Sequence, residues 1–151
     1  MLNRSTLLLT LLLSIGCTTH HQVFLDPSLP IHDSKIGNNI PVSLYVEDTR
    51  QSNIIAKWQK GFRKFSISAQ NDLKDIFSSK IQQGLKKLDF IPKVRTRDPN
   101  HSLKIDILNI KSKYTVSPRM NVRVKTNLRA TCNNNGRKYS HLYSAKKSRI
   151  G

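Results

Sequence analysis

Acidic residues are scarce in this chain. Of its 151 residues, 26 are lysine or arginine and 9 are aspartate or glutamate, with Glu47 the one glutamate. General acid–base catalysis needs titratable groups held together at one site. Two aspartates three residues apart, Asp72 and Asp75, fall in the first turn of a predicted helix, where the helix dipole favours anions. Because the sequence also lacks a Ser/His/Asp arrangement and a glycine-rich phosphate loop, we predict that the protein is not an enzyme and has no cofactor.

Cysteines are nearly absent as well. The two that occur, Cys17 and Cys132, exclude a scaffold held together by several disulfides. Cys132 lies on the apolar face of a predicted strand, and we expect it to be a small buried side chain. The histidines do not group with further metal ligands, and the adjacent His20 and His21 alone would bind a metal only weakly. We therefore predict no metal site.

The one long apolar run is at the N-terminus. It spans Leu7 to Cys17, too short for a membrane-spanning helix of about 20 residues, and it has the length of a secretory signal sequence. The run ends in Gly16-Cys17, which resembles a bacterial lipobox, where the signal peptidase cuts before the cysteine and the sulfur receives a diacylglycerol. We predict that residues 1–16 are a signal peptide and that Cys17 is lipidated. An ordinary signal peptide followed by a chance cysteine is the alternative.

Positive charge dominates the composition. The formal net charge is +17, and Arg4 is the one charged side chain within residues 1–16, so the excess persists after cleavage. Such an excess favours polyanionic partners. A secreted, lipid-anchored protein rarely meets nucleic acid, so we expect lipopolysaccharide, anionic phospholipid or a cell-wall polymer instead. A basic surface that is merely solvated is the alternative.

Hydrophobic periodicity predicts one helix and several strands. Residues 72–88 carry apolar side chains at steps of three and four, as an amphipathic helix does. Strands are predicted at 41–46, 62–68, 90–94, 102–116, 119–132 and 137–144. The alternation changes phase near Leu108, which indicates a β-bulge, and Asn133 to Gly136 predicts a hairpin turn. We expect an α+β fold, an antiparallel or mixed sheet of about five strands with the helix packed on one face.

These elements divide the chain into parts. Residues 17–39 lack periodicity and are expected to be a lipidated cysteine followed by a flexible tether. Residues 40–144 form a single α+β domain, and residues 145–151 form a polar tail. Trp58 lies between Lys57 and Lys60 in a stretch expected to be irregular. It packs against the first strand or, in the other interpretation, anchors the protein at a membrane or glycan interface.

The strand predicted at 119–132 has one apolar and one polar face. The polar face carries Arg123, Lys125 and Arg129, and residues two apart on one strand face are separated by about 6.8 Å. Lys111 and Lys113 on the neighbouring strand extend this basic row. These five residues are candidate ligands for the phosphate of a headgroup. The solvated side of an antiparallel sheet explains the same pattern.

Several segments, taken in order, carry a family resemblance. After the lipobox come Asp26-Pro27-Ser28, Ile36 to Asn39 and Val42 to Arg50, followed by a helix opening at Asp72-Leu73 and a strand at Leu103 to Leu108. This order resembles the uncharacterised YajG-type lipoproteins of Gram-negative bacteria. The resemblance implies an anchor at the outer membrane and no established activity, so it assigns no catalytic residues.

One departure from that family concerns the C-terminus. Members continue past the last strand into a further helical segment, so we expect this chain to be a truncated or frame-shifted relative. Such a chain would leave part of the apolar face of residues 120–132 uncovered, and an exposed face of that kind attracts a partner or aggregates.

The sequence as a whole predicts a lipoprotein with a non-enzymatic binding or structural role. Thr18 after the cysteine, in place of aspartate, fits sorting to the outer membrane, with the domain on the periplasmic side. The expected partners are the membrane, through the lipid, and another envelope protein. The alternative is an anionic glycolipid or polymer, such as lipopolysaccharide or phospholipid headgroups, bound by the basic sheet face.

Overall fold

A computed structural model describes residues 18–26, 30–94, 100–116 and 120–150 of the chain. The predicted signal peptide and Cys17 lie outside these described residues. The elements, in chain order, are β1 (Thr18–Val23), β2 (Pro41–Asp48), β3 (Ile54–Lys60), β4 (Arg63–Ala69), α2 (Leu73–Lys87), β5 (Ile91–Val94), β6 (His101–Val116), β7 (Met120–Asn134) and β8 (Arg137–Ile150). None of the described residues form a helix with the length and hydrophobicity that crossing a bilayer requires.

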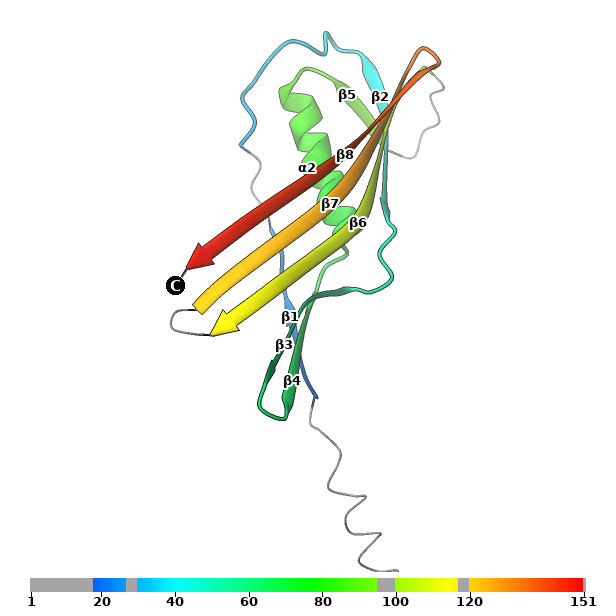
Figure 1. Cartoon of the computed structure of the whole chain (residues 1–151). Helices are drawn as coiled ribbons and strands as arrows, with labels where there is room; N and C mark the ends of the chain where they lie inside the picture. The colour runs from blue at the N-terminus through cyan, green and yellow to red at the C-terminus, as the bar shows by residue number, and fades with distance from the viewer. Residues whose placement is uncertain (1–17, 27–29, 95–99, 117–119, 151) are drawn as a thin grey trace, which may run out of the picture.

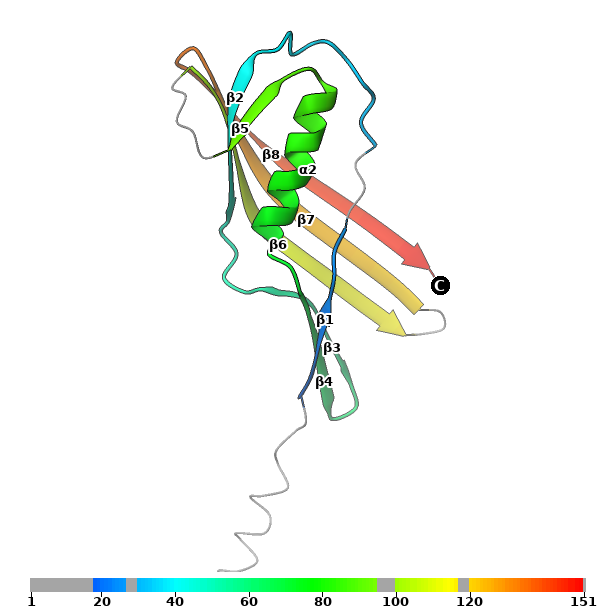
Figure 2. The same ribbon diagram turned by 180° about the vertical axis from the view of Figure 1, so that it is seen from behind.

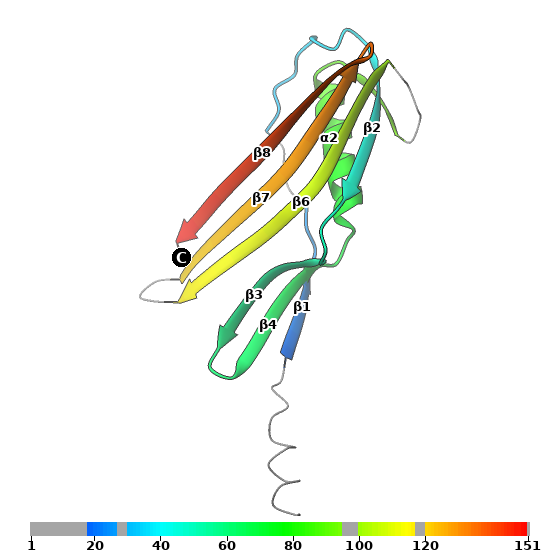
Figure 3. The ribbon, with the colours of Figure 1, turned by 45° about the vertical axis from the view of Figure 1, so that its right-hand side comes forward.

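All eight strands belong to one mixed sheet organised around β6. The strand order is β1-β4-β3-β6-β2-β5, with β7 added to the other side of β6 and β8 added to β7. β2 pairs in parallel with the first part of β6, and β3 joins β6 further along at Ala56 and Ser112. Figures 1 and 3 show β6, β7 and β8 as long, twisted strands, while β1, β3 and β4 form an arm that projects from the opposite end to the β7–β8 turn.

The predicted fold class is wrong. The chain is mostly β, with eight strands in a curled sheet instead of an α+β sheet of about five strands covered by a helix. Two of the strands, β1 and β3, were not expected from the sequence. β1 reads Thr-Thr-His-His-Gln-Val and has no apolar alternation, because its pairing with β4 depends on residues more than 40 positions away. Local periodicity does not report such a pairing.

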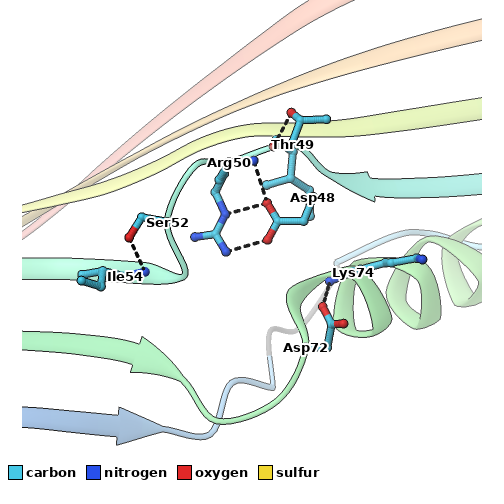
Figure 4. A network of polar contacts seen from close by, with 8 residues as sticks. Asp48, Thr49, Arg50, Ser52, Ile54, Asp72 and Lys74 are labelled. Atoms are coloured by element: carbon cyan, nitrogen blue, oxygen red, sulfur yellow. Dashed lines mark hydrogen bonds and ion pairs between the residues drawn. The ribbon is translucent and has the colours of Figure 1, made fainter.

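The predicted helix is confirmed as α2. Its N-cap is Asp72, whose carboxylate accepts a hydrogen bond from the backbone N–H of Lys74 at 2.8 Å (Figure 4). Leu73 and Ile76 of the helix join the buried core, which also contains Leu44 and Val46 of β2 and Ile105 and Ile107 of β6. Figure 2 shows that α2 lies over one end of the sheet and leaves the outer parts of β6, β7 and β8 without a covering layer.

The β-bulge and the C-terminal hairpin are confirmed. The register between β6 and β7 shifts between Ile107 and Asn109, so Leu108 is the inserted residue. Because of the insertion, Ile110 returns to the core face of the strand. Asn135 and Gly136 form the two-residue turn between β7 and β8, both at positive φ, which a type I′ turn requires.

The segment expected to be a tether is paired with the rest of the fold in the residues described. Thr18–Val23 forms β1, in parallel register with Lys64 to Ala69 of β4. Further along, the backbone N–H groups of Ser34, Gly37 and Asn39 donate hydrogen bonds of 2.8 Å to the carbonyls of the last residue of α2 and of the two residues that follow it. A side chain at Gly37 would collide with the backbone of Asp89, so this close approach requires glycine.

The expected polar tail is part of a strand. β8 continues through Ala145 to Ile150, in antiparallel register with β7 as far as Asn121. A two-residue turn fixes the register of both strands that leave it. Every residue of β8 therefore has a defined neighbour on β7.

Candidate functional site

Four of the five basic residues predicted to bind anions lie together on one face of the sheet. Lys111 of β6 is opposite Lys125 of β7, and Lys113 is opposite Arg123. Residues directly opposite each other on antiparallel strands share a face. β8 adds a further cation, because Lys146 is opposite Lys125. We call this group of Lys111, Lys113, Arg123, Lys125 and Lys146 the cationic face.

The cationic face carries uncompensated charge. Lys111, Lys125 and Lys146 form one row across three neighbouring strands, each about 4.8 Å from the next. All five side chains are exposed, and in the part of the chain that the structure describes none of them takes part in a salt bridge. Like charges directly opposite one another destabilise a sheet. An oxyanion held between the ammonium groups would remove this repulsion.

Arg129 lies apart from the other predicted anion ligands. It is four residues from Lys125 on the same strand, a separation of about 13.6 Å, and it is opposite Asp106. Asp106 and Glu47 both form ion pairs with Lys104, at 3.0 and 2.8 Å. Hydrogen bonds from the ammonium to Glu47, and then to Asp106, raise the pKa of Lys104 above its usual value. This end of the face is therefore charge-balanced.

Lys146 was not predicted as part of the site, although the sequence holds a signal for it. Because the turn Asn135-Gly136 has two residues, pairs across it have a constant sum of residue numbers, and Lys146 must oppose Lys125 wherever the strands persist. The signal was missed because residues 145–151 show no apolar periodicity. A strand that is exposed to solvent on both faces has no apolar periodicity.

Beside the cationic face lies a pocket of about 600 Å³. It occupies the break where β2 has ended and β3 has not yet joined β6. The residues that line it are Thr49 to Ser52, Ile54 to Lys57 and Leu108 to Ser112, so Lys111 belongs to both the pocket and the face. The wall is held by the hydroxyl of Ser112, which donates to the carbonyl of Ile55 at 3.2 Å, and by Thr49 Oγ1, which donates to the carbonyl of Ile107 at 3.0 Å.

Arg50 is the most deeply placed cation of the pocket, with a side chain only 7% exposed. Its Nε and Nη2 donate to the two carboxylate oxygens of Asp48 at 2.8 and 2.7 Å. This bidentate pair holds the pKa of Asp48 below its usual value, and the hydrogen bond from Arg50 is the main cause. Nη1 is buried and has no hydrogen-bond partner among the described residues. Figure 4 shows this nitrogen on the side of the guanidinium away from Asp48.

Two other residues discussed in the sequence analysis have defined surroundings. The ring of Trp58 stacks on Phe65 of β4, with centroids 5.2 Å apart and planes 7° from parallel, so it is packed within the arm. The prediction that Cys132 is buried is wrong, because its free thiol is exposed, close to the turn that joins β7 to β8. No group of three or more histidine, cysteine, aspartate or glutamate side chains within the described ranges could hold a metal ion.

His20 has a structural role that the sequence did not indicate. Its two ring nitrogens lie 2.8 Å from the hydroxyl of Ser66 and 3.0 Å from the hydroxyl of Ser68. Both serines are buried. The imidazole therefore joins β1 to β4 through side chains as well as through the backbone.

Comparison with solved structures gives a shared fold. Protein XCC0632 from Xanthomonas campestris, of family DUF330, is similar with a TM-score of 0.50 and 10% identity, over 87% of this chain and 78% of its own. An uncharacterised protein is similar with a TM-score of 0.46 and 9% identity, over 85% of this chain and 80% of its own. At such low identity the first of these likenesses shows the fold alone.

Sequence comparison gives the family. No curated protein matches the chain. The model of a family described as "Uncharacterized lipoprotein" matches residues 27–151, which is most of the sequence. A lipoprotein family indicates a location in the cell envelope. The expected resemblance to an uncharacterised lipoprotein family is thus confirmed, and the chain belongs to this family of uncharacterised lipoproteins.

Proposed function

We propose that this lipoprotein is anchored through Cys17 to the periplasmic side of the outer membrane and acts by binding, with no catalytic step. Its ligand in this proposal is a phosphate-bearing glycolipid or polymer of the envelope, held on the cationic face. The observation that carries the proposal is the row of Lys111, Lys125 and Lys146, three ammonium groups on neighbouring strands with no acidic partner among the described residues.

The chemistry of the row suits phosphate groups on a surface. Each lysine presents a compact charge with three donors on a flexible stem, so the row can follow phosphates whose spacing varies. The side chains are exposed, and the attraction is therefore long-ranged but screened by salt. A deep pocket with fixed bidentate donors would instead select one small molecule. A broad, salt-sensitive interaction with an anionic surface is what this geometry supports.

The test measures retention on immobilised lipopolysaccharide and on anionic and neutral vesicles, at low and high salt. The variant replaces all three lysines of the row: Lys111→Gln, Lys125→Gln and Lys146→Gln. A lysine near an anionic surface contributes about 1 kcal/mol, so binding should fall by more than tenfold. High salt should also weaken the binding of the native protein.

The matched control changes three exposed lysines elsewhere: Lys74→Gln, Lys86→Gln and Lys93→Gln. It has the same net charge as the test variant, so it separates the position of the charge from its amount. The proposal requires the control to keep most of its binding. Equal losses in both variants would mean that the basic surface is only solvated and attracts anions without a site. Crosslinking in intact cells then identifies any protein partner.

A further inference from the structure

The tip of the β3–β4 hairpin exposes an aromatic side chain completely. Phe62 is 96% exposed, more than any other large apolar side chain in the described residues. It lies in a two-residue turn with Gly61, whose φ is +58°, and the three flanking residues Lys60, Arg63 and Lys64 are all exposed cations. We call residues 60–64 the hairpin tip. A bare phenylalanine gives nothing to the stability of a domain in water, whereas it can be buried in a lipid interface.

The register of β1 places the start of that strand beside the hairpin tip. Thr18 is the partner of Lys64, and the two strands run in parallel from there. Paired strands are about 4.8 Å apart, and one residue spans at most about 3.6 Å. Thr18, the first residue of β1, is therefore at the same end of the arm as Phe62. Figures 2 and 3 show the start of β1 and the β3–β4 turn at the same end of the arm.

The arm is held together along its length. β1 pairs with β4 over six residues, His20 bridges to Ser66 and Ser68, and Trp58 stacks on Phe65 between β3 and β4. β3 has seven residues and therefore spans about 23 Å. A lipid attached next to Thr18 would thus be separated from the rest of the fold by a paired, three-stranded arm instead of a free linker.

We infer that the hairpin tip is a second membrane contact, in which Phe62 enters the boundary between headgroups and acyl chains and the three flanking cations contact anionic headgroups. This inference rests on the proposed lipid at Cys17, because that lipid brings the tip to the bilayer. Aromatic side chains are favoured at this depth, and lysine and arginine are attracted to anionic headgroups. The lipid retains the protein, and the tip orients it, with the arm directed away from the membrane.

The experiment uses the full lipidated chain in vesicles that contain anionic lipid. In a Trp58→Phe background, Phe62→Trp places a single indole at the tip, and Tyr139→Trp places one beside the β7–β8 turn at the far end of the molecule. We expect the indole at position 62 to shift its emission to shorter wavelength and to lose more than half its intensity with lipids brominated in the acyl chains. We expect neither change at position 139.

Two outcomes would overturn the inference. Absence of quenching at position 62 would show that the tip does not enter the bilayer, and equal quenching at both positions would show that the domain lies flat. The mass of the N-terminal peptide reports the lipid separately, so failure of the anchor is distinguishable from failure of the tip. Lys60→Gln, Arg63→Gln and Lys64→Gln together should reduce the quenching in anionic vesicles and leave it unchanged in neutral ones.

Discussion

The sheet has one region that α2 covers and one that it leaves uncovered, and a single row of side chains runs from the first to the second. Ile107 of β6 is opposite Leu128 of β7, which is opposite Tyr143 of β8, so all three share a face. Ile107 is 0% exposed, Leu128 is half-buried and Tyr143 is 55% exposed. A helix is about 10 Å across and strands are about 4.8 Å apart, so α2 covers roughly two strands. The side chains of this row therefore become exposed from β6 to β8, although the alternation of apolar and polar residues continues in the sequence.

The comparison separates what holds the fold from what is available for binding. At the covered end, β2 and β6 supply Leu44 and Ile107, the two largest fully buried side chains, beneath α2. At the uncovered end, β8 is wet on both faces, with Tyr139, Leu142 and Tyr143 all more than half exposed. The cationic face lies on the side of the sheet away from α2, because Lys125 has the opposite parity along β7 to Leu128 and Ala130, which pack against the core. Changes there should alter binding with little effect on folding, and changes beneath α2 should do the reverse.

The largest expected effect comes from the covered end of the row. Ile107→Ala should lower the free energy of unfolding by about 4 kcal/mol, because a fully buried side chain leaves a cavity. Tyr143→Ala, in the same row, should lower it by no more than about 1 kcal/mol, as for an exposed position. Urea denaturation of both variants measures the difference. Similar losses at the two positions would contradict the division of the sheet into covered and uncovered regions.

The ion pair at the end of β2 comes next. Asp48→Asn leaves the buried guanidinium of Arg50 without its carboxylate, and since Asp48 is a quarter exposed we expect a loss of about 2 kcal/mol, below the range for fully buried pairs. The pKa of Asp48 is lowered in the fold. Its contribution to stability is therefore present above the unfolded-state pKa, about 3.9, and is lost as pH falls through the folded value. The urea midpoints of the two proteins should converge between pH 5 and strongly acidic pH, and a constant gap would contradict this assignment.

The reactivity of the Cys132 thiol tests whether this part of β7 is uncovered. Its thiol is exposed, so a thiol reagent should modify it fully in native buffer. Cys132→Ser should change the free energy of unfolding by less than about 0.5 kcal/mol, as surface substitutions do. A thiol that reacts only in denaturant would show that this part of β7 is covered.

The smallest effect concerns the repulsion within the cationic face. Lys125→Gln removes the middle charge of the row and should stabilise the fold by about 0.3 kcal/mol at low salt, since like charges opposite each other are unfavourable. Lys93→Gln is the matched control, an exposed lysine on a different strand. The gain should vanish at high salt, which screens the repulsion. Equal effects of both substitutions would mean that the row has no special repulsion.

Local patterns predicted the parts of this fold that local forces determine. The periodicity of α2, the phase change at Leu108 and the Asn135-Gly136 turn were all visible in the sequence. β1 and β3 were not. β1 is nearly all polar, and its partner β4 is more than 40 positions away, whereas β3 was missed although it forms a local hairpin with β4. The burial of Cys132 was predicted wrongly for a related reason: alternation fixes the face of a side chain, and a second layer decides whether that face is covered.

The candidate site, too, was predicted only as far as local sequence patterns determine it. Lys111, Lys113, Arg123 and Lys125 were grouped correctly, because the alternation of two long strands fixed their face. Alternation alone grouped Arg129 with them. Its cross-strand neighbour is the acidic Asp106, so among the described residues Arg129 lies beside a negative charge and the other four residues do not. Lys146 and the pocket around Arg50 required the register of the whole sheet, which no single segment encodes.

The central claim is that the cationic face binds an anionic envelope component, and lysine footprinting tests it most directly. The lipidated protein is acetylated with and without lipopolysaccharide, and the modification of each lysine is measured by mass spectrometry. The account predicts that the ligand protects Lys111, Lys125 and Lys146 and leaves Lys74, Lys86 and Lys93 reactive. Equal protection of both sets, or protection of neither, would contradict it.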